Sequence, residues 1–307
     1  DKELLGKVYE SVEITGHITK ETAEITGLAE GTPVVGGAGD NAAAAVGTGI
    51  VREGAAFTTI GTSGVVYAHT DKPVIDKKGR VHTFCCAVPG CWHVMGVTQG
   101  AGLSLKWFRD NFCNAEKETA VLMGVDPYYL MDKGVLQSPV GANRLLYLPY
   151  LMGERTPHLD PDARGVFFGL SAMHTKRDML RAVMEGVAYS LRDCMEVLKE
   201  MGVSVNDMMA CGGGGSSPVW RQMLADLYTC PVKTVDSKEG PALGVAILAA
   251  VGAGIYSSVP EACDAIIHTA NTQQPDAENI PEYEKYYQLY KNIYPALKEQ
   301  FKALSAL

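Results

Sequence analysis

One carboxylate, Asp40, stands in the glycine- and alanine-rich segment Gly31–Gly49. Val34 and Val35 are typical of the end of a buried strand, the glycines after them permit a tight turn, and the alanines from Ala42 favour a helix. Asp40 is therefore expected at a helix start, where free N–H groups and the helix dipole favour a charged carboxylate. Such a carboxylate could act as a general base or could merely cap the helix, and this segment alone does not favour the base.

Three further glycine-rich junctions occur later in the chain. Gly61-Thr-Ser-Gly64 follows the strand-like Phe57–Ile60, Gly100–Gly102 precedes a helical pattern, and Gly212–Gly215 follows a short apolar strand. Backbone N–H groups in such turns can bind phosphate, and bare glycine lets a flat ring come close to the chain. Several turns of this kind beside Asp40 indicate a nucleotide site more strongly than any one of them, and we expect the three junctions to converge on one side of the sheet.

Common nucleotide motifs do not explain these junctions. Gly37–Ala42 matches the loose dinucleotide pattern G-x-G-x-x-G/A, but such a site also needs an acidic residue about 20 residues later, at the end of the second strand. Here Phe57–Ile60 runs into the Gly61–Gly64 turn instead. Neither a GxxxxGK[ST] P-loop nor a protein-kinase signature is present.

Composition narrows the class of protein. The 307 residues are 47% hydrophobic and 20% charged with a net charge of −8, and no Lys/Arg-rich run or membrane-length apolar stretch is found. We therefore expect small-molecule partners, no nucleic acid and no membrane. Eight cysteines without a C-x-x-C pair favour a cytoplasmic location. The chain opens on Asp1 rather than methionine, which indicates a piece of a longer polypeptide.

The elements that must position the junctions can be outlined from periodicity. Ala55–Thr59 with Val65–His69, and Val81–Pro89 with Trp92–Val97, predict two β-hairpins. A capping box at Thr175 and apolar residues at spacings of three and four predict a long helix that ends at Gly202. Strand–helix units and a terminal amphipathic helix follow.

Two motifs in the middle of the chain resemble a known family. Gly165–Leu170, then seven residues, then Asp178–Glu185 is similar to the second signature of the FGGY carbohydrate kinases. Pro149–His158 together with Asp160–Gly165 is similar to the xylulokinase branch of that family. The resemblance covers nearly the whole chain but only the carboxy-terminal half of such an enzyme.

The resemblance implies an α/β fold of the actin-like (ribonuclease H-like) ATPase class, with a mixed five-stranded sheet and helices on both faces. It implies that residues 1–30 connect to a missing amino-terminal lobe of the same polypeptide, and that residues 31–307 form the carboxy-terminal ATP-binding domain. It also allows a homodimer, although the sequence does not give the oligomeric state.

Roles follow from the resemblance residue by residue. Asp40 matches the catalytic base, and Asp40 and Asn41 match substrate-binding positions. The implied nucleotide-binding residues are Gly61, Thr62, Ser63, Gly100, Gly102, Lys106, Gly212, Gly213, Gly214 and Ser217. ATP and Mg²⁺ are the implied cofactors, and no metal ligand is assigned in this chain.

The reaction implied is transfer of the ATP γ-phosphoryl group to a sugar hydroxyl, with D-xylulose as substrate and xylulose 5-phosphate as product. A kinase for gluconate, ribulose or glycerol is the alternative within the family, and a nucleotide-binding module without turnover is the alternative outside it. Because the first phosphate turn and most sugar contacts belong to the missing lobe, this piece alone is expected to be inactive.

Overall fold

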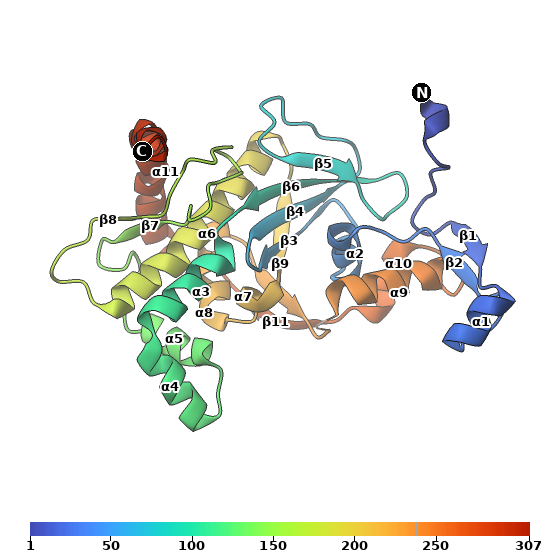
Figure 1. Ribbon diagram of the computed structural model, residues 1–307, viewed down its shortest axis with the longest axis horizontal. Coiled ribbons are helices and arrows are strands. Elements are labelled where there is room, and N and C mark those ends of the chain that lie inside the picture. The colour runs from blue at the N-terminus through green and yellow to red at the C-terminus, as the bar shows by residue number, and fades with distance from the viewer. Residues whose placement is uncertain (238) are drawn as a thin grey trace.

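A mixed seven-stranded sheet forms the centre of the computed structural model, which describes residues 1–237 and 239–307. Neighbouring strands follow the order β11-β10-β9-β3-β4-β6-β5, of which β9-β3-β4-β6-β5 can be followed in Figure 1. The three strands β3, β9 and β10 are parallel, and the other neighbours are antiparallel. The bounds are β3 (Gly54–Ile60), β4 (Gly64–Thr70), β5 (His82–Cys85), β6 (Trp92–Thr98), β9 (Val205–Cys211), β10 (Val232–Val235) and β11 (Thr269–Gln273).

The expected mixed sheet is present, but the expected number of five strands is wrong. Strands β10, β9, β3, β4 and β6 form a five-stranded centre, and one further antiparallel strand is added at each edge. At one edge, β5 forms the hairpin with β6 that the sequence predicts. The expected number of five strands did not include it. At the other edge, β11 has the sequence Thr-Ala-Asn-Thr-Gln and is mostly exposed, so it carries no apolar alternation by which it could be recognised.

One face of the sheet is covered by α3 (Ala101–Phe112), α6 (Lys176–Glu200) and α8 (Pro218–Tyr228), with α11 (Asn279–Ser305) packed outside α8. Helix α6 begins with the predicted capping box, in which the Asp178 carboxylate accepts from the backbone N–H of Thr175 at 2.8 Å. Most of α6 is buried because it lies against β4 and β6 below and α3 and α8 beside it. Ala56, Val66 and Val94 of the sheet share its apolar core.

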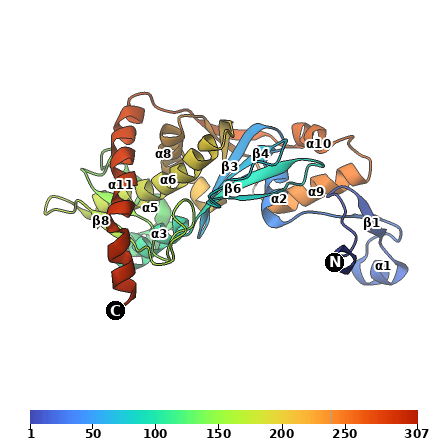
Figure 2. The same cartoon turned by 90° about the horizontal axis from the view of Figure 1, so that it is seen from above.

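The opposite face carries α2 (Asp40–Gly47), α9 (Gly240–Gly252) and α10 (Val259–Ile266), so helices cover both faces as expected (Figures 1 and 2). Helices α2 and α9 approach so closely that a Cβ atom on Gly47 or Gly244 would collide with the other helix's backbone. Phe57 and Tyr67 of the sheet pack with the end of α2 on this side.

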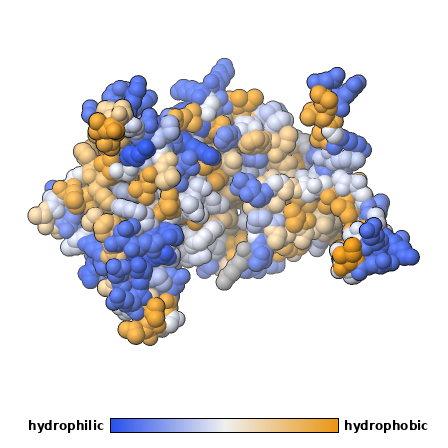
Figure 3. All heavy atoms as spheres, in the orientation of Figure 1, coloured by the Kyte–Doolittle hydropathy of each residue, from blue (hydrophilic) through white to orange (hydrophobic). Residues whose placement is uncertain are grey.

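The remaining elements lie outside these layers. A small antiparallel pair, β1 (Ile14–His17) and β2 (Pro33–Val35), and helix α1 (Lys20–Thr26) lie at the end of the molecule opposite α11 (Figure 2). The others are η1 (Lys2–Leu4), α4 (Asn114–Met123), α5 (Pro127–Val135), β7 (Leu146–Leu148), β8 (Val166–Phe168) and α7 (Gly212–Gly215). Exposed apolar side chains gather at the end of α4 (Figure 3). Among the described residues, no helix has both the length and the apolarity to cross a bilayer.

Candidate functional site

The three glycine junctions after residue 60 meet at one cavity of about 500 Å³. Its wall includes Gly61 and Thr62 from the β3–β4 turn, Gly102 from the start of α3, and Gly213 and Gly214 from α7. The expected convergence of these junctions is confirmed. Their contact with nucleotide stays a prediction, because convergence does not identify the ligand.

The β3–β4 turn is held at the cavity by the first turn of α3. The N–H groups of Gly102 and Leu103 donate to the carbonyl oxygens of Gly61 (2.7 Å) and Thr62 (3.1 Å). A side chain at Gly102 would collide with the Gly61 carbonyl, and one at Gly100 would collide with the Pro149 carbonyl. Both glycines therefore permit close packing, and two N–H groups at the start of α3 already have backbone partners. Gly102 still lines the cavity, whereas Gly100 is buried outside its wall.

The four glycines of α7 have different surroundings. Gly212 has a φ of +75°, which favours glycine. A Cβ atom on Gly214 would overlap the side chain of Ile60, and one on Gly215 would lie 3.0 Å from the backbone of Ala210. A Cβ atom on Gly213 would meet nothing within 4 Å. Gly213 is thus the glycine of α7 that the fold does not require, and its bare backbone faces the cavity.

Ser217 connects the cavity to a helix that the sequence did not reveal as part of the site. As N-cap of α8 it accepts from the Trp220 N–H at 3.1 Å, and its hydroxyl donates to Asp132 of α5 at 2.8 Å. Burial raises the pKa of Asp132, and the bond from Ser217 opposes that shift. The cavity residues missed from sequence are Ile60, Leu103, Leu105, Asp126, Tyr128, Tyr129, Asp132, Pro218 and Trp220.

A sequence signal for α5 does exist. Asp126 is followed by Pro127, and an N-cap aspartate with proline at the first helical position is a typical helix start. Two tyrosines follow at once, and both line the cavity. Helix α5 reaches the cavity because it packs beside α6. This packing depends on long-range contacts, which the local sequence pattern does not show.

Lys106 is the one cationic residue among the described residues that line the cavity. It lies on α3, is exposed, and its ammonium group donates to Asp110 at 2.7 Å. An exposed pair of this kind is weak, so an anionic ligand could attract the ammonium group away from Asp110. Ser63, predicted with this group, is half-buried in the β3–β4 turn but does not line the cavity.

Asp40 is the first residue of α2, and the N-cap position is occupied by Gly39, which offers no side chain. The exposed Asp40 carboxylate accepts from the N–H of Asn41 at 2.8 Å. It therefore interacts with a free N–H of the helix without being the N-cap residue. Neither Asp40 nor the half-buried Asn41 belongs to the wall of the 500 Å³ cavity.

Comparison with known proteins places the fold in the actin-like ATPase class, as predicted, because the similar solved structures are kinases of that fold. The profile of the FGGY family of carbohydrate kinases, C-terminal domain, matches residues 56–253, and that of the N-terminal domain matches residues 1–47. The chain therefore belongs to the FGGY family of carbohydrate kinases.

Individual relatives agree with this family. The chain is 39% identical over 299 residues to a xylulose kinase of Bacillus subtilis, covering 97% of this chain and 58% of that protein. It is 37% identical to a gluconokinase of Bacillus licheniformis, covering 98% and 58%. A crystal structure of a "xyloylose kinase" from Brucella ovis superposes with a TM-score of 0.86 at 32% identity, covering 97% and 59%. The chain thus spans less than two thirds of the length of these relatives.

Proposed function

We propose that this chain supplies the nucleotide-binding part and the catalytic base of a kinase that phosphorylates D-xylulose with ATP. The observation that carries the proposal is the cavity at which the glycine junctions of an FGGY-family chain meet. The first relatives, named xylulose kinases, support D-xylulose as the sugar.

The cavity is suited to an adenine nucleotide in two respects. Its wall is largely apolar, with Leu103, Tyr128 and Trp220, and its bare backbone at Gly213 leaves space for a flat ring. The exposed hydroxyl of Thr62 and the ammonium group of Lys106 lie on the same wall and could interact with phosphate oxygens. We therefore propose that adenosine lies along Gly212–Ser217 with its phosphates toward Thr62.

Magnesium ion would neutralise phosphate charge in such a reaction. Among the described residues, no cluster of three potential metal ligands lies on the cavity wall. The isolated carboxylates there, Asp126 and Asp132, do not make a magnesium site, and Asp132 is already bonded to Ser217. We therefore assign no Mg²⁺ ligand to this chain and derive no step from the ion.

Asp40 is proposed to accept the proton of the terminal sugar hydroxyl as that oxygen attacks the γ-phosphorus. Its exposed carboxylate at the start of α2 can reach a substrate. Phosphoryl transfer depends mainly on position and charge, so the sugar must also be held in line with the phosphate. We propose that polypeptide beyond the 58% of its relatives' length spanned here supplies those contacts, and we expect no sugar phosphorylation by residues 1–307 alone.

The test is a substrate comparison with the full-length gene product. Phosphorylated sugar is measured directly, with ATP and either D-xylulose, gluconate, ribulose or glycerol. We expect the highest kcat/KM with D-xylulose. A higher value with gluconate would favour the second candidate, which the gluconokinase relatives support. ATP binding without turnover of any sugar would indicate a nucleotide-binding module.

A further inference from the structure

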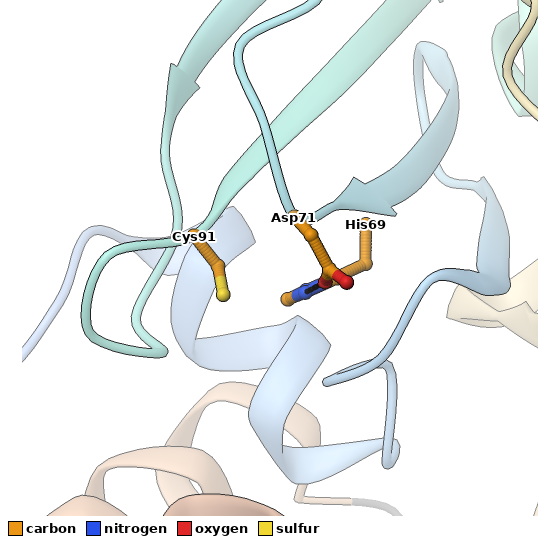
Figure 4. A group of neighbouring side chains, drawn as sticks. All are labelled: His69, Asp71 and Cys91. Carbon is orange, nitrogen blue, oxygen red and sulfur yellow. Dashed lines mark ion pairs between the residues drawn. The ribbon is translucent and has the colours of Figure 1, made fainter.

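A second group of chemically active side chains lies at the other end of β4 from the cavity. Strand β4 begins at Gly64, beside the turn that lines the cavity, and ends at Thr70. His69 near its end, Asp71 just after it and Cys91 just before β6 point toward one another (Figure 4). Each offers one potential ligand atom, and these three atoms lie within 4.8 Å of one another. No other such group of three or more histidine, cysteine or acidic residues occurs among the described residues.

The His69 ring is buried and one of its nitrogens has no hydrogen-bond partner. The residue is 1% exposed, and Nε2 lies 3.4 Å from the Asp71 carboxylate without making a hydrogen bond. The other nitrogen, Nδ1, lies 3.8 Å from Sγ of Cys86. The Cys86 thiol donates to the Val88 carbonyl at 3.5 Å, so its sulfur can accept the Nδ1–H. In the tautomer with the proton on Nδ1, the lone pair of the ring is on Nε2, toward Asp71 and Cys91.

The Asp71 carboxylate makes this point suited to a cation. One of its oxygens lies 3.4 Å from Nε2 of the buried His69 ring, and the two atoms are not joined by a hydrogen bond. A metal ion between them would give both a partner, because the ring nitrogen offers a lone pair and the carboxylate a negative charge.

We propose that Nε2 of His69, a carboxylate oxygen of Asp71 and Sγ of Cys91 bind one divalent transition-metal ion, with Zn²⁺ preferred. Imidazole nitrogen, carboxylate oxygen and thiolate sulfur are the ligands of tetrahedral zinc, and three protein ligands leave the fourth position to water. Magnesium prefers oxygen ligands alone, so this is not an Mg²⁺ site. On binding, the Cys91 S–H proton passes to solvent and the S–Zn bond forms, with no change of oxidation state. With the ion bound, the Cys86 sulfur would accept from Nδ1–H and so orient the ring.

The site has a structural role in this position. Cys91 closes the turn between β5 and β6, and Ala87 and Val88 of that turn pack in one apolar cluster with Ala42 and Val46 of α2. The ion would join the end of β4 to this turn and so stabilise the surface on which α2 rests. We therefore expect Zn²⁺ to raise the thermal stability of the protein.

Cobalt(II) is the spectroscopic probe for the site. The protein is treated with a chelator, kept reduced with a phosphine, titrated with Co²⁺ and then with Zn²⁺ in competition. We expect one ion per chain, a thiolate-to-cobalt charge-transfer absorption, displacement by Zn²⁺ and release of one proton. Cys91→Ser should abolish the absorption and weaken Zn²⁺ binding by at least roughly tenfold, because loss of even an outer partner of a metal ligand costs that much.

Two further variants make the result decisive. Cys85→Ser removes the exposed cysteine of β5, outside the group, and should leave cobalt and zinc binding unchanged. Asp71→Asn changes a side chain that is 58% exposed, so it should fold normally, keep the charge-transfer absorption and bind Zn²⁺ more weakly. Absence of cobalt binding, absorption that survives in Cys91→Ser, or unchanged Zn²⁺ affinity in Asp71→Asn would overturn the proposal. If Cys91→Ser does not fold, the proposal is decided by the Zn²⁺ affinity of Asp71→Asn and by the proton release of the wild-type protein.

Discussion

At the scale of single residues, the glycines of α7 separate into those that the fold requires and one that it does not. Gly212 has a positive φ, and Gly214 and Gly215 are pressed against Ile60 and Ala210. Gly213 has free space where a Cβ atom would stand, and it lines the cavity. A side chain can therefore be added at Gly213 to fill the cavity without disturbing the packing beneath it.

Gly213→Val is predicted to weaken ATP binding without unfolding the protein. The valine side chain would occupy the space proposed for adenosine, and a loss of 1.4 kcal/mol, about one good contact, already corresponds to a tenfold change in Kd. We expect a decrease of roughly tenfold or more by isothermal titration calorimetry. Gly214→Ala is the contrast, because it should lower Tm without ATP through its overlap with Ile60. An unchanged Kd for ATP in Gly213→Val would contradict the proposed position of adenosine.

Asp193 gives a second prediction at this scale, on stability and pH. This buried carboxyl accepts from the Tyr287 hydroxyl at 2.7 Å, and burial raises its pKa to about 7. The folded protein therefore keeps a proton that the unfolded chain loses above pH ~4. This retained proton adds to the free energy of unfolding. The added stability is complete below that pH and is lost as the pH rises to about 7, where the free energy of unfolding falls by up to roughly 1.4 kcal/mol per pH unit.

Asp193→Asn is predicted to reduce this decline, because the amide carries no charge and its oxygen can still accept from Tyr287. Urea unfolding at several values between pH 4 and pH 8 measures the slope. Part of the slope should remain, since burial also raises the pKa of Glu154 to about 7. Asp264→Asn, at an exposed carboxylate paired with Arg52, is the control and should not alter the slope between pH 5 and pH 8. If the slope in Asp193→Asn equals that of the wild type, Asp193 is not a source of the pH dependence of stability.

At the scale of elements, the close contact of α2 with α9 determines where the start of α2 lies. Gly47 and Gly244 allow the two backbones to touch, since a side chain on either would collide with a carbonyl of the other helix. The alanines of α2 complete this narrow interface. Because Asp40 is the first residue of α2, its position depends on this contact.

Gly244→Ala is accordingly predicted to destabilise the protein by about 1–3 kcal/mol, the usual cost of overpacking. In the full-length gene product it should also lower sugar phosphorylation, because separation of α2 from α9 displaces Asp40. Gly240→Ala in the same helix is the matched control, since a Cβ atom there would meet nothing within 4 Å. Equal unfolding free energies for the two variants would show that the helices separate without cost.

The elements also show which features a sequence can predict. Helix α6 was predicted with its cap because its signals are local: Thr175 and Asp178 lie three residues apart, and its apolar positions recur at helical spacing. The glycine junctions could be predicted as parts of one site because several turns with free N–H groups together indicate a phosphate-bearing ligand, although packing also explains most of these glycines. The edge strand β11 was missed because it is polar and exposed, and the cavity residues of α5 were missed because only tertiary packing brings them to α7.

At the scale of the whole molecule, β4 connects two places with different chemistry. Its first residue follows the turn that lines the proposed nucleotide cavity, and its end carries the proposed zinc ligand His69. Helix α2 packs against the turn that precedes Cys91 and begins at Asp40. The proposed base and the proposed nucleotide cavity thus lie on separate elements of one sheet-centred framework, and the proposed reaction requires a sugar hydroxyl that reaches both Asp40 and the γ-phosphate.

Asp40→Asn in the full-length gene product tests this arrangement. The asparagine keeps the shape of the side chain and can still accept from the N–H of Asn41, but it cannot accept the sugar's proton. We expect kcat for D-xylulose to decrease by roughly 10²-fold or more, the range for loss of a general base, with a smaller change in the Kd for ATP. Sugar phosphate must be measured directly, so that idle ATP hydrolysis is not counted. Near-normal turnover would show that Asp40 is not the general base. Its role would then be to stabilise the start of α2 through its bond to the Asn41 N–H.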